Sequence, residues 1–282
     1  MVGNDGDDQT AILPLEHAGN AMSVSMNSVN LRAFDSVENG RANRAKAGLF
    51  PAEEAALQAV PEAVRRGRVL ELGVGTGRLV PTLADQAATY LGVDYAAQAI
   101  QEAQRAFPDV TFRRMDARDM PDLAVDAFDF AVFSYNGLDY VDHEGRCRAL
   151  TEIARVLRPG GYFLFSFHNR DFRDLDRTLE PRQIPLWERV LFFWLAGARR
   201  RRDALRDELA KGCRATSDYA ILNDSGMNYA LLTYYSDLAA QTALLARTGF
   251  EVEAAYAIDG CRIDPGEVFE DDYMVHVLCR KS

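Results

Sequence analysis

The chain has 282 residues, of which 48% are hydrophobic and 26% are charged, and its formal net charge is −10. This composition is typical of a globular protein, organised as one large domain or as one domain with an insertion. The acidic balance argues against a general nucleic-acid surface. No stretch is as long as a membrane span and no apolar signal core is present, so we expect neither integral membrane association nor export.

The four cysteines lie far apart in the sequence and have no C-x-x-C spacing. This usage is typical of reduced thiols, so we expect a cytoplasmic protein without a structural zinc ion. Residues 1–30 are polar and small, which favours a mobile or loosely docked segment. Pro51 suits a first helical turn, and a helix over 51–66 is predicted to cover the sheet edge. From residue 68 strands and helices alternate, which indicates a parallel sheet with crossover helices.

Residues 69–79 carry most of the functional information. An apolar strand ends in a turn with glycines at 73, 75 and 77, and a helix-compatible stretch over 78–88 follows. Glycines at such a turn allow positive φ and let a ligand approach the backbone closely. The helix behind them offers free N–H groups. This pattern predicts a nucleotide-type ligand site at the carboxyl end of a parallel strand.

The spacing of these glycines argues against a nicotinamide dehydrogenase. A dinucleotide fold requires G-x-G-x-x-G, whereas the glycines here alternate and Glu71 stands two residues before the first. A second predicted strand ends at Asp94, whose carboxylate can accept two hydrogen bonds from a ribose diol. A third strand over 110–114 leads into Met115-Asp116-Ala117, where an acid can meet the exocyclic amine of an adenine.

The later elements continue the alternation. A strand over 128–133 is followed by a helix over 143–157, a turn at 158–161 and a strand over 162–167. A helix over 236–247 then leads to two closing strands. Over 68–169 the chain resembles the class I S-adenosylmethionine-dependent methyltransferases. The resemblance rests on the motif E-x-G-x-G-x-G, on Asp94 and on Asp116-Ala117, and it returns at 236–279.

The resemblance implies an α/β fold with a seven-stranded, mostly parallel sheet flanked by helices, the last strand antiparallel. It also implies S-adenosylmethionine as the cofactor. Because 170–235 is too long for a direct link, we expect an inserted helical cap after strand five. The cofactor-binding residues that it implies are Glu71, Gly73, Gly75, Thr76, Gly77, Asp94, Tyr95, Met115, Asp116, Ala117 and Ser134.

The chain is therefore expected to divide into three parts. An N-terminal segment covers 1–50, the catalytic domain covers 51–169 and 236–282, and the cap covers 170–235. Within the first part, Leu31 to Asp35 is similar to a helix that many of these enzymes fold over the cofactor, with Phe34 where a tyrosine often stands. Arg41 and Arg44 could touch a carboxylate, although a solvated helix face is the favoured interpretation.

Two interpretations of Ile184 to Arg206 stay open. In the first, an amphipathic helix packs its aromatic side chains on the core, and its arginines pair with acids at helical spacing. In the second, the segment is a lid or interfacial helix that meets an apolar or anionic acceptor or a membrane surface. The aromatic side chains at issue are Trp187, Phe192, Phe193 and Trp194, and the arginines are Arg199 to Arg202.

The acceptor is expected beyond the ends of strands four and five. His168 is the candidate general base, and its alternative role is to orient a loop. Tyr140 falls where many related small-molecule and quinone methyltransferases have a histidine, and we expect it, with Asn136, to orient the nucleophile. His143 is expected to be a surface residue at a helix start.

A magnesium-dependent variant would use oxygen ligands from Asp139, Asn169 and Asp171. The histidine at 168, where such enzymes have an acid, suits magnesium poorly, so we expect no required metal.

The sequence thus predicts a methyltransferase acting on the oxygen or nitrogen of a small molecule or biosynthetic intermediate. The alternatives are another transfer, such as aminopropyl transfer, and a non-catalytic cofactor-binding module. Asn136 and Asp139 fit poorly the paired acids that aminopropyl transfer requires, and a pure sensor has no need of a large aromatic cap. The sequence leaves the oligomeric state open.

Overall fold

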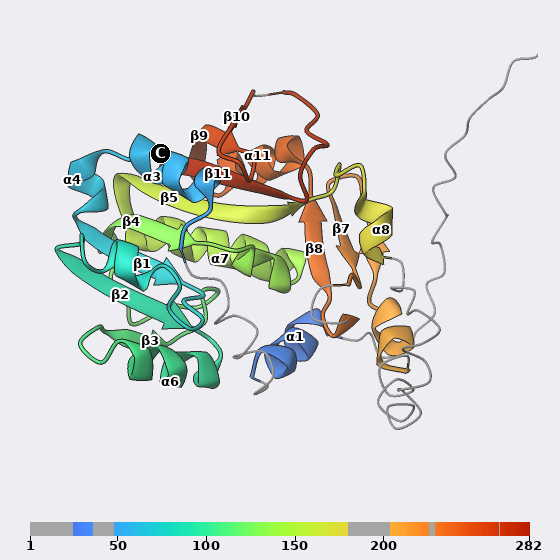
Figure 1. Ribbon diagram of the computed structural model, residues 1–282, viewed down its shortest axis with the longest axis horizontal. Helices are drawn as coiled ribbons and strands as arrows, with labels where there is room; N and C mark the ends of the chain where they lie inside the picture. Colours follow the sequence, from blue (N-terminus) through green and yellow to red (C-terminus); the bar gives the residue numbers. More distant parts are fainter. Residues whose placement is uncertain (1–24, 36–47, 180–203, 226–228, 265) are drawn as a thin grey trace, which may run out of the picture.

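The computed structural model describes residues 25–35, 48–179, 204–225, 229–264 and 266–282. They form one twisted sheet between layers of helices (Figure 1). Along the main path of the sheet the strands are β3 (Phe112–Arg114), β2 (Thr89–Asp94), β1 (Arg68–Leu72), β4 (Phe128–Phe133), β5 (Leu157–Asn169), β11 (Met274–Lys281), β9 (Phe250–Tyr256) and β10 (Arg262–Ile263). The first five are parallel, whereas β11 is antiparallel to both neighbours. The expected fold, including its antiparallel last strand, is confirmed.

Helices cover both faces of this sheet because its central strands are apolar on both sides. Helices α3 (Pro51–Ala59), α4 (Glu62–Arg65) and α5 (Val80–Leu83) contribute to one core cluster, whereas α7 (His143–Val156) and α11 (Leu238–Arg247) contribute to the other. The side chains of β4 alternate between them. Phe130 and Val132 pack toward α3, and Ala131 and Phe133 pack toward α7. Helix α6 (Ala97–Ala106) packs beside β3.

Two helices are shorter than the sequence pattern predicts. The helix predicted over 51–66 divides into α3 and α4, because Pro61 disfavours helical backbone at the residue before it. Val60 accordingly has ψ of 128°. The helix predicted over 78–88 is regular only over α5. Helix α11 begins near its predicted start, with the Asp237 side chain accepting a hydrogen bond from the backbone N–H of Ala240.

The segment 170–235 is not purely helical, which corrects the sequence-based expectation. It contains α8 (Leu175–Leu179) and a helix over 204–210, but also β6 (Arg214–Ala215), β7 (Tyr219–Leu222) and β8 (Thr233–Ser236). Strand β8 pairs in parallel with the end of β5, where Tyr235 lies opposite His168. The sheet therefore has eleven strands among the described residues. Most of Ile184 to Arg206, including its tryptophans and arginine run, lies outside them.

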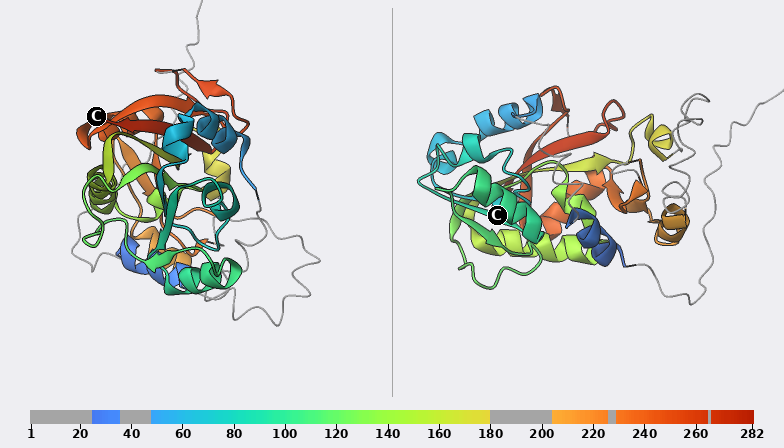
Figure 2. Two further views of the ribbon diagram at one scale, coloured as in Figure 1. Left: turned by 90° about the vertical axis from the view of Figure 1, so that its left-hand side faces the viewer. Right: turned by 60° about the horizontal axis from the view of Figure 1, so that its bottom comes forward.

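Helix α1 (Met26–Phe34) lies beside these inserted strands (Figures 1 and 2). Met26 joins a small buried cluster with Leu209, Ile221, Leu232 and Tyr234. The N-terminal helix and the inserted segment thus share a core of their own. Within the described parts of the chain, no helix is both long enough and apolar enough to cross a membrane.

Candidate active site

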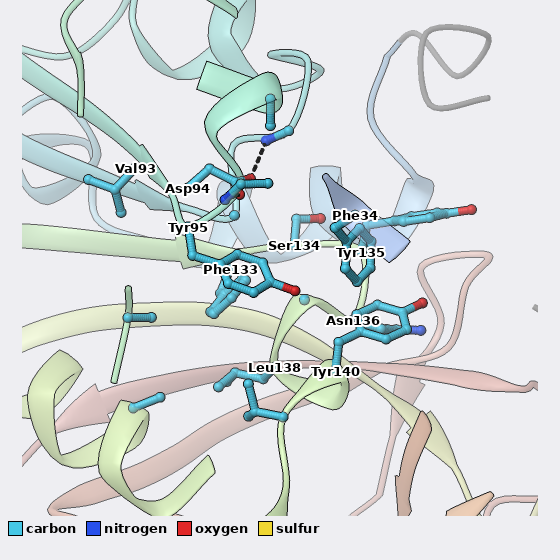
Figure 3. A pocket seen from close by; sticks show the side chains of 18 of the residues that line it. Phe34, Val93, Asp94, Tyr95, Phe133, Ser134, Tyr135, Asn136, Leu138 and Tyr140 are labelled. Carbon is cyan, nitrogen blue, oxygen red and sulfur yellow. Dashed lines mark hydrogen bonds between the residues drawn. The ribbon is translucent and has the colours of Figure 1, made fainter. Parts of the chain in front are cut away.

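A cavity of about 510 Å³ opens at the carboxyl ends of the parallel strands (Figure 3). This is the edge of the sheet where the glycine turn was expected to place a ligand. Most residues of the two predicted groups border it. From the cofactor group these are Gly73, Gly75, Thr76, Asp94, Tyr95, Met115, Asp116, Ala117 and Ser134, and from the acceptor group Asn136, Tyr140 and His168.

Glu71 and Gly77 do not border the cavity. The Glu71 carboxyl group is buried, and the Tyr90 hydroxyl donates a hydrogen bond to it at 2.6 Å. Burial raises the pKa of Glu71 to about 8, against the lowering effects of the Tyr90 hydrogen bond and the charge of Arg78. At Gly77 an added Cβ would lie 2.5 Å from the Phe107 ring. Both residues therefore pack within the protein beside the glycine turn and do not face the cavity.

Gly75 presents bare backbone to the cavity. Its φ is 55°, a value that favours glycine, and an added Cβ would meet only the Gly73 carbonyl oxygen, at 3.9 Å. Its N–H donates to Asp94 Oδ2 at 2.9 Å, and the N–H of Ala96 donates to Asp94 Oδ1 at 2.9 Å. Burial raises the pKa of Asp94, and these two amides partly counteract it. The Asp94 carboxylate borders the cavity, where it can accept a hydrogen bond from a ligand hydroxyl.

Asp116 is already paired within the protein. Arg118 donates to both of its carboxylate oxygens, at 2.5 to 3.0 Å. Burial would raise the pKa of Asp116, but the hydrogen bonds and charge of Arg118 outweigh that effect and lower it. Asp116 therefore borders the cavity as an ionised side chain held in place by its neighbour.

An ion pair between Arg78 and Glu53, which the sequence analysis did not predict, holds the glycine turn in place. Arg78 donates to both carboxylate oxygens of Glu53, at 2.5 and 2.8 Å, and to the Ser134 hydroxyl at 2.8 Å. Ser134 in turn donates to Glu53. Burial would raise the pKa of Glu53, but Arg78 and Ser134 lower it. Arg78 directly follows the third glycine, which was an available signal, whereas no sequence pattern connects it to Glu53.

At the other end of the cavity, His168 belongs to a buried charged chain. Its Nδ1 lies 2.8 Å from Asp139 Oδ2, and its backbone N–H donates to the same oxygen at 2.6 Å. Arg146 donates to Asp139 Oδ1 at 2.6 Å and to Gln241 at 2.7 Å. The side chains of Asp139 and Arg146 are both fully buried.

This arrangement assigns the imidazole tautomer. Asp139 accepts hydrogen bonds from Arg146 and from the His168 backbone N–H, so its carboxylate acts as the acceptor and Nδ1 of His168 carries the hydrogen. Its Nε2 then has a lone pair, to which no group in the described residues donates, and the ring borders the cavity. His168 borders the cavity at the end of β5, where the sequence analysis expected the acceptor. Asp139 was weighed there only as a metal ligand or a polyamine-binding acid, and Arg146 was not considered.

A strained turn and an aromatic wall separate the two ends. Tyr135 and Asn136 have φ of 54° and 59°, which is uncommon for residues other than glycine. The N–H of Asn136 donates to the Ser166 hydroxyl at 2.8 Å. Phe34 meets the Tyr140 ring edge-on at 4.9 Å between centroids. Figure 3 shows both rings at the cavity.

Two of the three residues weighed as magnesium ligands, Asp139 and Asn169, have other partners. Asp139 is held by His168 and Arg146, and Asn169 donates to two backbone carbonyls, one of them at Phe269. Over the ranges that the structure covers, no group of three or more histidine, cysteine or acidic side chains is placed to hold a metal ion.

Comparisons with known proteins agree with this geometry. Residues 69–161 match the family described as methyltransferase domain. An uncharacterized methyltransferase of Mycobacterium tuberculosis is 34% identical over 116 residues, which are 40% of this chain and 44% of that protein. The ubiquinone biosynthesis O-methyltransferase of Paracidovorax citrulli is 27% identical over 183 residues, 63% of this chain and 73% of that protein.

Solved structures extend the likeness to the whole fold. The 1,6-didemethyltoxoflavin-N1-methyltransferase of Burkholderia thailandensis, with bound S-adenosylhomocysteine, has a TM-score of 0.57 at 14% identity and covers 94% of this chain and 93% of its own. An S-adenosylmethionine-dependent methyltransferase from Mesorhizobium loti has a TM-score of 0.54 at 21% identity, with 82% and 98% covered. Residues 69–161 thus match a methyltransferase domain, and the chain shares the fold of S-adenosylmethionine-dependent methyltransferases. The chain spans less than half the length of the Mycobacterium tuberculosis relative that it matches.

Proposed function

We propose that the protein methylates a hydroxyl group of a small, largely apolar acceptor, with His168 as the general base. The observation that carries this proposal is the imidazole at the cavity wall, held through Nδ1 by the buried carboxylate of Asp139. A neutral amine can attack through its lone pair, whereas a hydroxyl is a weak nucleophile until its proton leaves. A positioned base therefore favours an oxygen acceptor.

S-adenosylmethionine would be held by the part of the cavity bordered by the glycine turn, Asp94 and Asp116. The bare backbone at Gly75 would accommodate its amino-acid end, and the Asp94 carboxylate would accept hydrogen bonds from its ribose diol. Bound S-adenosylmethionine supplies an electrophilic methyl group on a sulfonium. With the cofactor held there, the acceptor oxygen would approach from the side of His168, which also borders the cavity.

The protein's own groups provide proton transfer and orientation. Nε2 of His168 takes the acceptor proton, and Asp139 stabilises the imidazolium that results. Arg146 holds the Asp139 carboxylate in place through its hydrogen bond to Oδ1. Tyr140 and Asn136 orient the nucleophile, and the ring of Phe34 helps to exclude water.

The walls favour an acceptor with an aromatic or otherwise apolar body. Phe34, Phe133, Leu138 and Tyr140 are among the residues that line the cavity. Two similar relatives are named for O-methylation, the ubiquinone biosynthesis enzyme of Paracidovorax citrulli and a fatty-acid O-methyltransferase of Mycolicibacterium smegmatis. They support an oxygen acceptor. The N1-methyltransferase neighbour shares the fold alone.

Variants of His168 test the proposal on a panel of phenols and hydroxy acids. Because general-base catalysis typically contributes about 10²–10⁴ in rate, His168→Ala should lower kcat by that order and leave cofactor affinity unchanged. His168→Gln should not restore turnover, since an amide cannot take the proton. His143→Ala is the matched control, because His143 is bonded to Tyr234 and does not border the cavity. Parental turnover in the glutamine variant would show that His168 only positions the loop.

A further inference from the structure

The side chain of Asn30, on helix α1, is fully buried and connects three distant segments. Its amide nitrogen donates to the Tyr140 carbonyl oxygen at 2.8 Å and to the Leu232 carbonyl oxygen at 2.7 Å. Its amide oxygen accepts from the Leu232 N–H at 3.0 Å. Asn30 therefore pairs with both backbone groups of Leu232, as a neighbouring strand would, and uses both of its N–H groups.

The two backbone partners of Asn30 belong to the acceptor end of the cavity. Tyr140 ends the short helix η1 (Gly137–Tyr140) and borders the cavity. Leu232 directly precedes β8, and Tyr235 of that strand lies opposite His168 in the parallel pairing with β5. One amide thus ties helix α1 to the turn that carries Tyr140 and to the inserted strand beside the candidate base.

Phe34 lies one helical turn after Asn30, so the two side chains project from the same face of α1. The Phe34 ring lies 4.9 Å from that of Tyr140 and 6.2 Å from that of Tyr95 between centroids. Tyr95 directly follows Asp94, on the cofactor side of the cavity. Phe34 therefore stands between the cofactor half and the acceptor half, where Figure 3 shows the three rings around the same space.

We propose that Asn30 is a positioning residue that holds Phe34 at this junction. The wall formed by α1 is then complete only when the helix, the Tyr140 turn and the inserted strand are docked together. The acceptor half of this inference rests on the proposed function, whereas the cofactor half does not. Asn27, earlier on the same helix, provides a comparison, because it pairs with Asp142 at 2.9 Å at the helix end remote from Phe34.

The test measures S-adenosylhomocysteine affinity by calorimetry, together with the melting temperature. Asn30→Ala should weaken this affinity about tenfold, because buried backbone groups lose their partner and Phe34 is no longer fixed. Asn27→Ala should change it less than about twofold. Since Asn30 acts through Phe34, the double variant Asn30→Ala with Phe34→Ala should bind within about twofold of Phe34→Ala alone.

Two results would overturn the inference. One is parental affinity in Asn30→Ala with a fall in melting temperature equal to that of Asn27→Ala, which would make Asn30 a stabilising residue only. The other is a double variant whose fold-loss of S-adenosylhomocysteine affinity equals the product of the fold-losses of the two single variants. Should Asn30→Ala not fold, Asn30→Ser is measured in its place against the same criteria. No acceptor is needed, so failure of the proposed hydroxyl chemistry would leave this test unaffected.

Discussion

Asp94 shows how a single side chain can serve both the fold and the ligand. Its two oxygens accept hydrogen bonds from the N–H groups of Gly75 and Ala96, which shapes the glycine turn, and the same carboxylate borders the cavity. The same carboxylate is therefore part of the loop and, in our proposal, the acceptor for the ribose hydroxyls.

Replacing Asp94 tests the ribose assignment. Asp94→Ala removes an acceptor for two hydroxyls and should weaken S-adenosylmethionine binding by about 2–3 kcal/mol, since hydrogen bonds to charged groups contribute about 1.5–3 kcal/mol each and rarely add fully. The S-adenosylmethionine affinity of Asp94→Asn should fall nearly as far, because the NH₂ group of the asparagine would face a backbone N–H. Calorimetry provides the measurement, with the exposed Asp109→Ala as control. Unchanged affinity in both Asp94 variants would rule the assignment out.

At the scale of elements, the inserted segment matters most. The helix over 204–210 presents Leu209 to a cluster shared with α1 and the inserted strands, and that side chain is 1% exposed. Leu209 is therefore packed as core. It lies beyond Ile184 to Arg206, so both interpretations of that segment stay predictions. The aromatic stretch of that segment lies outside the described residues.

Two leucines on this helix provide a matched comparison. Leu209→Ala should lower the free energy of unfolding by about 2–4 kcal/mol, because it removes buried methyl groups and leaves a cavity. Leu205→Ala, on the same helix but 38% exposed, should change it by less than about 1 kcal/mol. Urea unfolding of both variants measures the two changes in the free energy of unfolding. Equal and small effects would mean that the helix does not pack on the core and is a detachable lid.

At the scale of the whole molecule, the features that could be predicted from the sequence are those set by local pattern and by the order of the strands. The glycine turn, Asp94 and Asp116 each follow a strand directly, and the carboxyl ends of parallel strands meet at one edge, so local pattern and topology were sufficient. The contact between Arg146 and Asp139 depends on how α7 packs on the sheet, and the contact between Arg78 and Glu53 on how α3 does. Such contacts between distant residues leave no periodic signal in the sequence.

The inserted strands escaped prediction for a related reason. Strand β7 has four residues and β6 has two, too short for alternation to be distinguished from a loop. Their pairing, and that of β8 with the end of β5, is set by tertiary contacts. The same packing brings α1 next to the insert, which no pattern in residues 1–50 indicated.

The most direct test of the central claim is the identity of the products formed from S-adenosylmethionine with a panel of hydroxylated aromatic acceptors. Mass spectrometry should find an O-methylated acceptor and an equal amount of S-adenosylhomocysteine, with formation slowed about 10²–10⁴-fold in His168→Ala. Release of methylthioadenosine would indicate aminopropyl transfer instead. An N-methylated product made equally fast by parent and His168→Ala would contradict the assignment of an oxygen acceptor and its base.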